Sequence, residues 1–136
     1  MQDVRWKQRF ENFDRAVALL REPIEKGIDT LSDLEKEGTV HRFELAFELA
    51  WKALKDYLEF SGAVVMPVTP RDVIKEAFAA KILPDGDVWI NMLNHRNRLS
   101  HTYDETMFDD AVRAIGSTYL KAILKLHAWL KERAAE

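Results

Sequence analysis

Apolar side chains recur along most of this chain at steps of three and four residues, the period of an amphipathic α-helix. The first stripe consists of Trp6, Phe10, Phe13, Val17 and Leu20. Pro23 is expected to end this helix, because proline lacks the backbone N–H that continues it. Residues 22–39 are rich in charge and contain Gly27 and Gly38, so we predict a connector there, with a short helix around 31–36.

A second helix is predicted from about Val40 to the Ser61-Gly62 pair. Its stripe consists of Val40, Phe43, Phe47, Ala50, Trp51, Leu54 and Leu58. The apolar run 63–68 contains Pro67 and has no partner strand, so we interpret it as a loop. Thr69 then marks a new helix start, since it can cap the helix and is followed by Pro70.

Three further helices follow from the same period. The third ends before Pro84, the fourth runs from about Asp87 through 91–103, and the last is capped by Asp104 or Thr106. The inward positions of the third and fourth are Val73, Ile74, Ala77, Phe78, Val88, Trp89, Met92 and Leu93. The stripe of the last consists of Phe108, Val112, Ile115, Tyr119, Ala122, Ile123, Leu126 and Leu130.

About five helices with short connections predict an all-α fold, an up-and-down antiparallel bundle, with residues 1–136 in one domain. The last helix carries a second apolar row beside its stripe, formed by Leu120, Leu124 and Ala128. This row favours a helix-on-helix homodimer, or it widens the face that the helix turns to its own core. Both interpretations remain open at the level of sequence.

Composition narrows the functional classes. The chain of 136 residues contains no cysteine, which excludes disulfides, zinc–thiolate sites and cysteine nucleophiles. A net charge of −3 argues against a non-specific coat on nucleic acid but leaves room for a local basic patch. The sequence shows no signal peptide and no apolar run that could span a bilayer, so we expect a cytoplasmic protein without a membrane partner.

The segment 91–103, Asn-Met-Leu-Asn-His-Arg-Asn-Arg-Leu-Ser-His-Thr-Tyr, holds two of the four histidines. Its central pattern is Arg96, His101 five residues later, and Tyr103. Cleavage of RNA by its own 2′-hydroxyl needs a base near neutral pH, which histidine provides, and a cation on the phosphate, which arginine provides. One histidine per chain supplies one proton-transfer group, so a dimer cleft would supply two.

Helix geometry constrains this pair. Five residues turn through about 140° on an unbroken helix, so Arg96 and His101 would point well apart. We therefore expect the helix to end or distort near residues 99–100, with His101 in the last turn or just beyond. Alternatively, His101 only caps a helix C-terminus and Tyr103 is a half-buried aromatic residue.

Other polar residues near the pattern have simpler interpretations. His95 and Arg98 are expected to be rim charges or part of a solvated face. Glu44 and Glu48 are like charges four residues apart. Either Lys52 simply relieves Glu48, or one of the two glutamates pairs with Arg96 or Arg98 and orients it.

A metal site would need ligands on two facing helices. His41, Glu44 and Glu48 share roughly one helix face, but no second helix offers matching ligands, so we predict neither a metal nor another cofactor.

Three stretches resemble the HEPN (higher eukaryote and prokaryote nucleotide-binding) superfamily, and within it the nucleotidyltransferase substrate-binding proteins. They are Phe-Glu-Leu-Ala-Phe-Glu-Leu-Ala-Trp-Lys-Ala-Leu-Lys at 43–55, Pro-Arg-Asp-Val-Ile-Lys-Glu-Ala-Phe at 70–78, and Trp-Ile-Asn-Met-Leu at 89–93 with Arg-Asn-Arg-Leu-Ser-His-Thr-Tyr at 96–103. The resemblance spans most of the chain.

The resemblance implies a dimeric helical bundle in which the Arg-x4-His motifs of two protomers meet in a cleft that holds RNA or nucleotide. Nuclease members cut RNA there without metal. In the branch paired with a separately encoded minimal nucleotidyltransferase, the HEPN protein is the toxin, and the partner transfers nucleotide to its tyrosine. Arg96 and His101 would then be catalytic, Asn97 their companion, and Tyr103 the modified residue.

Two alternatives stay open beside a ribonuclease toxin. The chain could be a non-catalytic accessory subunit that binds substrate or nucleotide for the nucleotidyltransferase. It could also be a binding module in which Tyr103 serves only as a modification acceptor.

Overall fold

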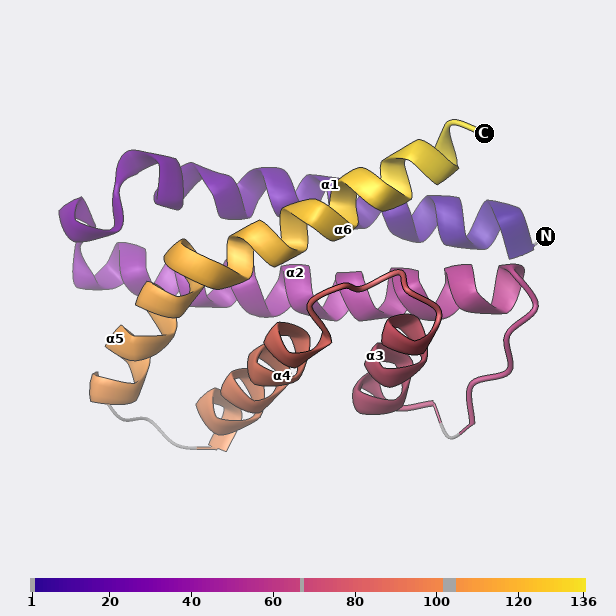
Figure 1. Cartoon of the computed structure of the whole chain (residues 1–136). Helices are drawn as coiled ribbons and strands as arrows, with labels where there is room; N and C mark the ends of the chain where they lie inside the picture. The colour runs from indigo at the N-terminus through magenta and orange to yellow at the C-terminus, as the bar shows by residue number, and fades with distance from the viewer. Residues whose placement is uncertain (1, 67, 102–104) are drawn as a thin grey trace.

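The chain forms an all-α helical bundle in the computed structural model (Figure 1). The structure describes the backbone of residues 2–66, 68–101 and 105–136, and their side chains except at 2, 3, 100, 101 and 105. The α-helices are α1 (Gln2–Lys26), α2 (Asp33–Phe60), α3 (Pro70–Ala79), α4 (Gly86–His101), α5 (Glu105–Ala114) and α6 (Leu120–Ala134). A 3₁₀ turn, η1 (Ile28–Thr30), follows α1, and a π-helical segment, η2 (Ile115–Tyr119), joins α5 to α6.

The central element is α2, which packs against α1, α3, α5 and α6. Figure 1 shows α1 and α2 as a long antiparallel pair, with α6 crossing the pair diagonally and the shorter α3 and α4 together along one side. The expected apolar stripes meet between these helices and bury Phe13, Phe43, Phe47, Leu54 and Trp89 completely. The prediction of a helical bundle is therefore confirmed.

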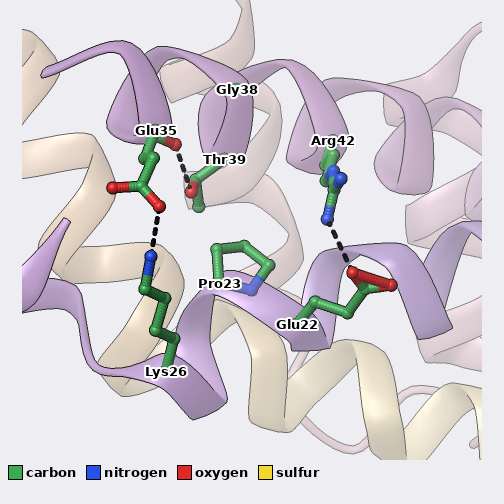
Figure 2. A pocket seen from close by; sticks show the side chains of 7 residues that line it. All are labelled: Glu22, Pro23, Lys26, Glu35, Gly38, Thr39 and Arg42. Atoms are coloured by element: carbon green, nitrogen blue, oxygen red, sulfur yellow. Dashed lines mark hydrogen bonds and ion pairs between the residues drawn. The ribbon is translucent and has the colours of Figure 1, made fainter. Parts of the chain in front are cut away.

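The first helix does not end at Pro23, as the sequence suggested, but continues to Lys26. Proline has no N–H, so it cannot bond the carbonyl oxygen of Leu19 four residues earlier. Arg42 on α2 replaces this donor, because its Nη1 lies 2.7 Å from the Leu19 oxygen. The guanidinium also lies 3.6 Å from Glu22, and Figure 2 shows Pro23 between this ion pair and the next one. A donor from another helix thus lets α1 run on through its proline.

The predicted connector 22–39 is also wrong, because α2 begins at Asp33 and not at Val40. Its start is a capping box: Glu35 N donates to Ser32 Oγ over 3.2 Å, and Ser32 N donates to Glu35 Oε1 over 2.9 Å. The short helix expected around 31–36 forms the first turns of α2. The Ser-x-x-Glu signal is present in the sequence, but Gly38 and the many charges favour a connector there.

The last helical region contains a π-helical turn that its apolar stripe did not predict. A Cβ atom placed on Gly116 would lie 1.9 Å from Ile28 Cδ1, so η1 packs directly on the backbone of η2.

Thr106 lies inside α5 and therefore does not cap it, while Asp104 lies outside the described residues.

The second apolar row of the last helix serves mainly the bundle's own core. Leu120 is only 8% exposed, Leu124 packs partly buried against the core, and Ala128 is exposed. The wide-stripe interpretation therefore accounts for both leucines.

The prediction for the middle of the chain is largely confirmed. Residues 63–66 form no helix, and Asp72 N donates to Thr69 Oγ1 over 3.1 Å at the start of α3. Phe78 is an exception: it is 53% exposed, and its ring covers Gly86 instead of entering the core.

None of the helices in the described part of the chain is both long and apolar enough to cross a membrane.

Candidate functional site

Helix α4 carries the Arg-x4-His pattern and stays helical as far as His101, its last residue. The predicted position of His101 in the last turn is confirmed, whereas the expected helix end near 99–100 comes one or two residues too early. The side chain of His101 and the whole of Tyr103 lie outside the described residues. On this regular helix the backbone positions of Arg96 and His101 are about 140° apart around the axis.

Arg96 is held against α2 by Glu48. Its Nη2 donates to Glu48 Oε2 over 2.9 Å, and both side chains are 30% exposed. Glu48 also accepts a hydrogen bond of 3.0 Å from Trp51 Nε1 and lies 3.3 Å from Lys52 Nζ. The expected pairing of one glutamate with Arg96 is therefore made by Glu48. Glu44 forms no ion pair with the side chains that the structure describes.

A groove of about 550 Å³ lies along the other side of α4. Its described lining residues are Asn91, Asn94, His95, Asn97, Arg98 and Tyr119. Five of them lie on α4, between positions 91 and 98, and the sixth comes from the π-helical segment η2. Positions 94, 97, 98 and 101 fall on one side of the helix, so the backbone position of His101 lies on the groove side and not on the Glu48 side.

His95 and Tyr119 are joined across the groove. His95 Nδ1 lies 2.5 Å from Tyr119 Oη, and the Tyr119 ring stacks on the buried Phe43 with centroids 5.6 Å apart. Burial lowers the pKa of His95 from its ordinary value, and the Arg98 guanidinium lowers it further, while Asp110 opposes both. Burial also raises the pKa of the Tyr119 phenol. Both groups are therefore neutral near pH 7.

Sequence reasoning placed His95 on the rim and Tyr119 in the core, and it missed that the two form a pair. One signal could have found it: a tyrosine in a core stripe needs a partner for its hydroxyl group. The polar positions at 91, 94, 95 and 98 follow helical spacing and mark the side of α4 that faces Tyr119.

A second pocket, of about 400 Å³, lies at the α1–α2 turn (Figure 2). Its lining residues are Glu22, Pro23, Lys26, Glu35, Gly38, Thr39 and Arg42. The four charged residues form two ion pairs, Lys26 with Glu35 at 2.5 Å and Arg42 with Glu22 at 3.6 Å. These two ion pairs neutralise the charges and connect α1 to α2, so the pocket offers little to a charged ligand.

In the described ranges, no three histidine, aspartate or glutamate side chains lie close enough to share a metal ion. His41 is exposed, and Glu48 is engaged by Arg96.

Comparisons with known proteins show the family of this chain and support its fold. The family described as "nucleotidyltransferase substrate binding protein like" matches residues 8–132. The chain belongs to this HEPN-type family.

Two individual proteins are similar to the chain. A stretch of 71 residues is 28% identical to the "probable ribonuclease HepT" of Haemophilus influenzae and covers 50% of this chain and 49% of that protein. The match thus spans about half the length of the curated relative. A crystal structure of a Thermus thermophilus protein superimposes with a TM-score of 0.73 and 28% identity over 91% of this chain and 99% of that one.

Proposed function

We propose that this protein is a metal-independent RNA endonuclease that acts as a toxin and is silenced by a separately encoded minimal nucleotidyltransferase. Membership of the family and the similarity to a probable ribonuclease support this proposal. The observation that carries it is the position of the Arg-x4-His pattern: Arg96 is fixed by Glu48, and His101 follows at the end of the same helix.

In the proposed reaction, two copies of the chain form a homodimer and hold RNA in the cleft between them. One His101 takes the proton from a 2′-hydroxyl group, whose oxygen then bonds to the adjacent phosphorus. The bond from phosphorus to the 5′-oxygen breaks, and the second His101 donates a proton to this leaving oxygen. The products are a 2′,3′-cyclic phosphate and a free 5′-hydroxyl group. The first histidine is then protonated and the second is neutral, so the two exchange roles in the next turnover.

Arg96 stabilises the charge that develops on the phosphate oxygens, because a guanidinium can donate two parallel hydrogen bonds to them. Glu48 is its positioning residue, and Glu44 adds negative charge on the same helix face. Asn97 is the companion of Arg96 and accepts from its Nη1 over 3.3 Å. Arg98 lies on the groove side and attracts the strand. Transfer of nucleotide to Tyr103 by the partner silences the cleft.

The test is a ribonuclease assay on unmodified protein in the presence of a metal chelator. We expect wild type to cleave single-stranded RNA and His101→Ala to lose about 10²- to 10⁴-fold of the rate, the usual contribution of a general acid or base. Arg96→Ala should lose a similar amount, whereas His41→Ala, an exposed histidine outside the site, should cleave as wild type does. An intact substrate after incubation with folded, dimeric, unmodified wild type would reject the nuclease.

Two observations favour a second candidate function. Arg96 is already paired with Glu48, and the chain is acidic overall, which suits an accessory subunit that binds substrate or nucleotide for the nucleotidyltransferase without cutting RNA. This candidate predicts a stable complex with the partner and no cleavage. In a third case, a nucleotide on Tyr103 is the chain's whole role. This case predicts a nucleotide-sized mass increment on Tyr103 after co-expression, as the nuclease does, but no cleavage by the unmodified chain.

A further inference from the structure

The groove beside α4 presents hydrogen-bond donors. Asn94 Oδ1 accepts from Arg71 Nη2 over 3.2 Å, and Asn97 Oδ1 accepts from Arg96 Nη1 over 3.3 Å. A guanidinium only donates, so the atom that it meets on each amide must be the oxygen. The Nδ2 group of each asparagine is therefore the end left to face a ligand.

Arg98 and His95 extend this set of donors. Arg98 is exposed and lines the groove, and a guanidinium group has no acceptor atom. The neutral His95 ring has one N–H, and when Nδ1 accepts from the Tyr119 hydroxyl group, Nε2 carries that hydrogen. None of the described lining residues is acidic. Asp110 acts on His95 electrostatically from α5, but it does not line the groove.

A surface that offers donors and one full positive charge fits a ligand that has several acceptor oxygens and negative charge. We infer that the groove of Asn94, His95, Asn97 and Arg98 is a subsite for a phosphate group of a bound RNA strand, separate from the phosphate that Arg96 contacts. The inference rests on the proposed function in taking RNA as the ligand. It assigns the two sides of α4 different tasks, since Arg96 faces Glu48 and the subsite faces Tyr119.

Asn94→Asp provides a sharp test. The aspartate keeps an oxygen for Arg71 and nearly the same shape, but it replaces the donor with a second acceptor and adds a negative charge. Asn12→Asp is the matched control, because Asn12 Oδ1 accepts from Arg15 Nη2 over 2.5 Å on the exposed side of α1, outside the groove. Both changes alter the net charge equally and keep an arginine–oxygen contact.

Binding is measured by fluorescence anisotropy with a labelled single-stranded oligoribonucleotide, in a His101→Ala background that prevents cleavage. We expect Asn94→Asp to weaken binding about tenfold or more, as the loss of a charge-assisted contact does, and Asn12→Asp to change it less than twofold. Arg98→Gln should also reduce the slope of log K against log[salt] by about 0.7, the value for one phosphate contact on a single strand. Competition by AMP would show whether a free nucleotide phosphate also enters the subsite.

The outcomes separate this inference from the nuclease proposal. Equal binding by Asn94→Asp and Asn12→Asp, or an unchanged salt slope in Arg98→Gln, would overturn the subsite even if the enzyme cuts RNA. Weakened binding in both groove variants, together with no cleavage by wild type, would support the subsite and reject the nuclease. Absence of any RNA or AMP binding by folded wild type would overturn the subsite directly.

Discussion

At the scale of single residues, Arg42 completes a helix to which it does not belong. Its guanidinium donates to the Leu19 carbonyl that Pro23 leaves without a backbone partner. The hydrogen bond links α1 to α2 on their exposed side, next to the buried apolar stripes. The energetic role of the arginine therefore depends on the proline, and that dependence can be measured.

We predict that Arg42→Gln lowers the free energy of unfolding by about 1 kcal/mol, the usual net value of such a hydrogen bond. In a Pro23→Ala background, residue 23 regains its N–H and can bond Leu19 itself, so the same change should cost only a few tenths of that. Urea titrations of the four proteins give the coupling energy, and Glu22→Gln controls for the exposed ion pair. Equal costs in both backgrounds would contradict the assignment.

His95 predicts a pH dependence of stability. Its pKa is lowered in the folded state by burial, then by Arg98, against the opposing effect of Asp110, so the unfolded chain takes up the proton first as pH falls. Stability should therefore decrease as pH falls below about 6.5 towards the lowered pKa, and the contribution is complete above 6.5. His95→Gln should flatten this part of the curve. An NMR titration that places the His95 pKa above 6.5 would disprove the prediction.

At the scale of elements, two helical glycines have opposite environments. A Cβ atom on Gly38 in α2 would meet nothing within 4 Å, whereas one on Gly116 in η2 would lie 1.9 Å from Ile28 Cδ1. Gly38→Ala should raise the free energy of unfolding by about 0.5–1 kcal/mol through the lower backbone entropy of the unfolded chain. Gly116→Ala should lower it by about 1–3 kcal/mol through overpacking. Thermal and urea unfolding measure the effect of both substitutions. A Gly38→Ala variant that is less stable than wild type would contradict the prediction for this position.

The capping box at the start of α2 predicts behaviour in acid. The hydrogen bond from Lys26, followed by those from Ser32, lowers the pKa of Glu35 from 4.5 to about 2. A lowered carboxylate pKa contributes stability that is complete above 4.5 and is lost as pH falls towards about 2. Glu35→Gln keeps a side-chain oxygen for Ser32 but removes the charge, so its stability should vary less with pH in this range. Parallel curves for the two proteins, measured by chemical unfolding from pH 2 to 5, would contradict the assignment.

At the scale of the whole molecule, helical periodicity predicted the bundle because its stripes are long and each is buried by a neighbour. Pro23 and Gly38 led to wrong bounds for the first two helices, because proline and glycine indicate only the local preference of the backbone. They cannot reveal a hydrogen-bond donor that another helix supplies. The π-helical turn was hidden for a similar reason, because Gly116 is explained only by its contact with Ile28. The groove joins α4 to η2 through His95 and Tyr119, which are 24 positions apart in the sequence, and no local pattern predicts this contact.

The proposed cleft requires two chains, so the oligomeric state is itself a prediction. Light scattering should give a mass of about twice 15.8 kDa for the active protein. Mixing wild-type chains with an excess of His101→Ala chains should reduce cleavage more than the dilution alone does, because a mixed cleft contains only one of the two His101 side chains that the reaction needs. A monomer that retains full activity would reject the shared cleft.

The hydrogen bond between Arg42 and Leu19 also bears on the order in which the chain folds. Only residues 27–32 separate α1 from α2, so closing this hairpin costs little loop entropy and should come early. Until it closes, the Leu19 carbonyl group has no partner within α1, and the helix frays beyond this point. The end of the first helix thus becomes rigid only when the second arrives, and substitutions at Arg42 should slow folding more than they accelerate unfolding.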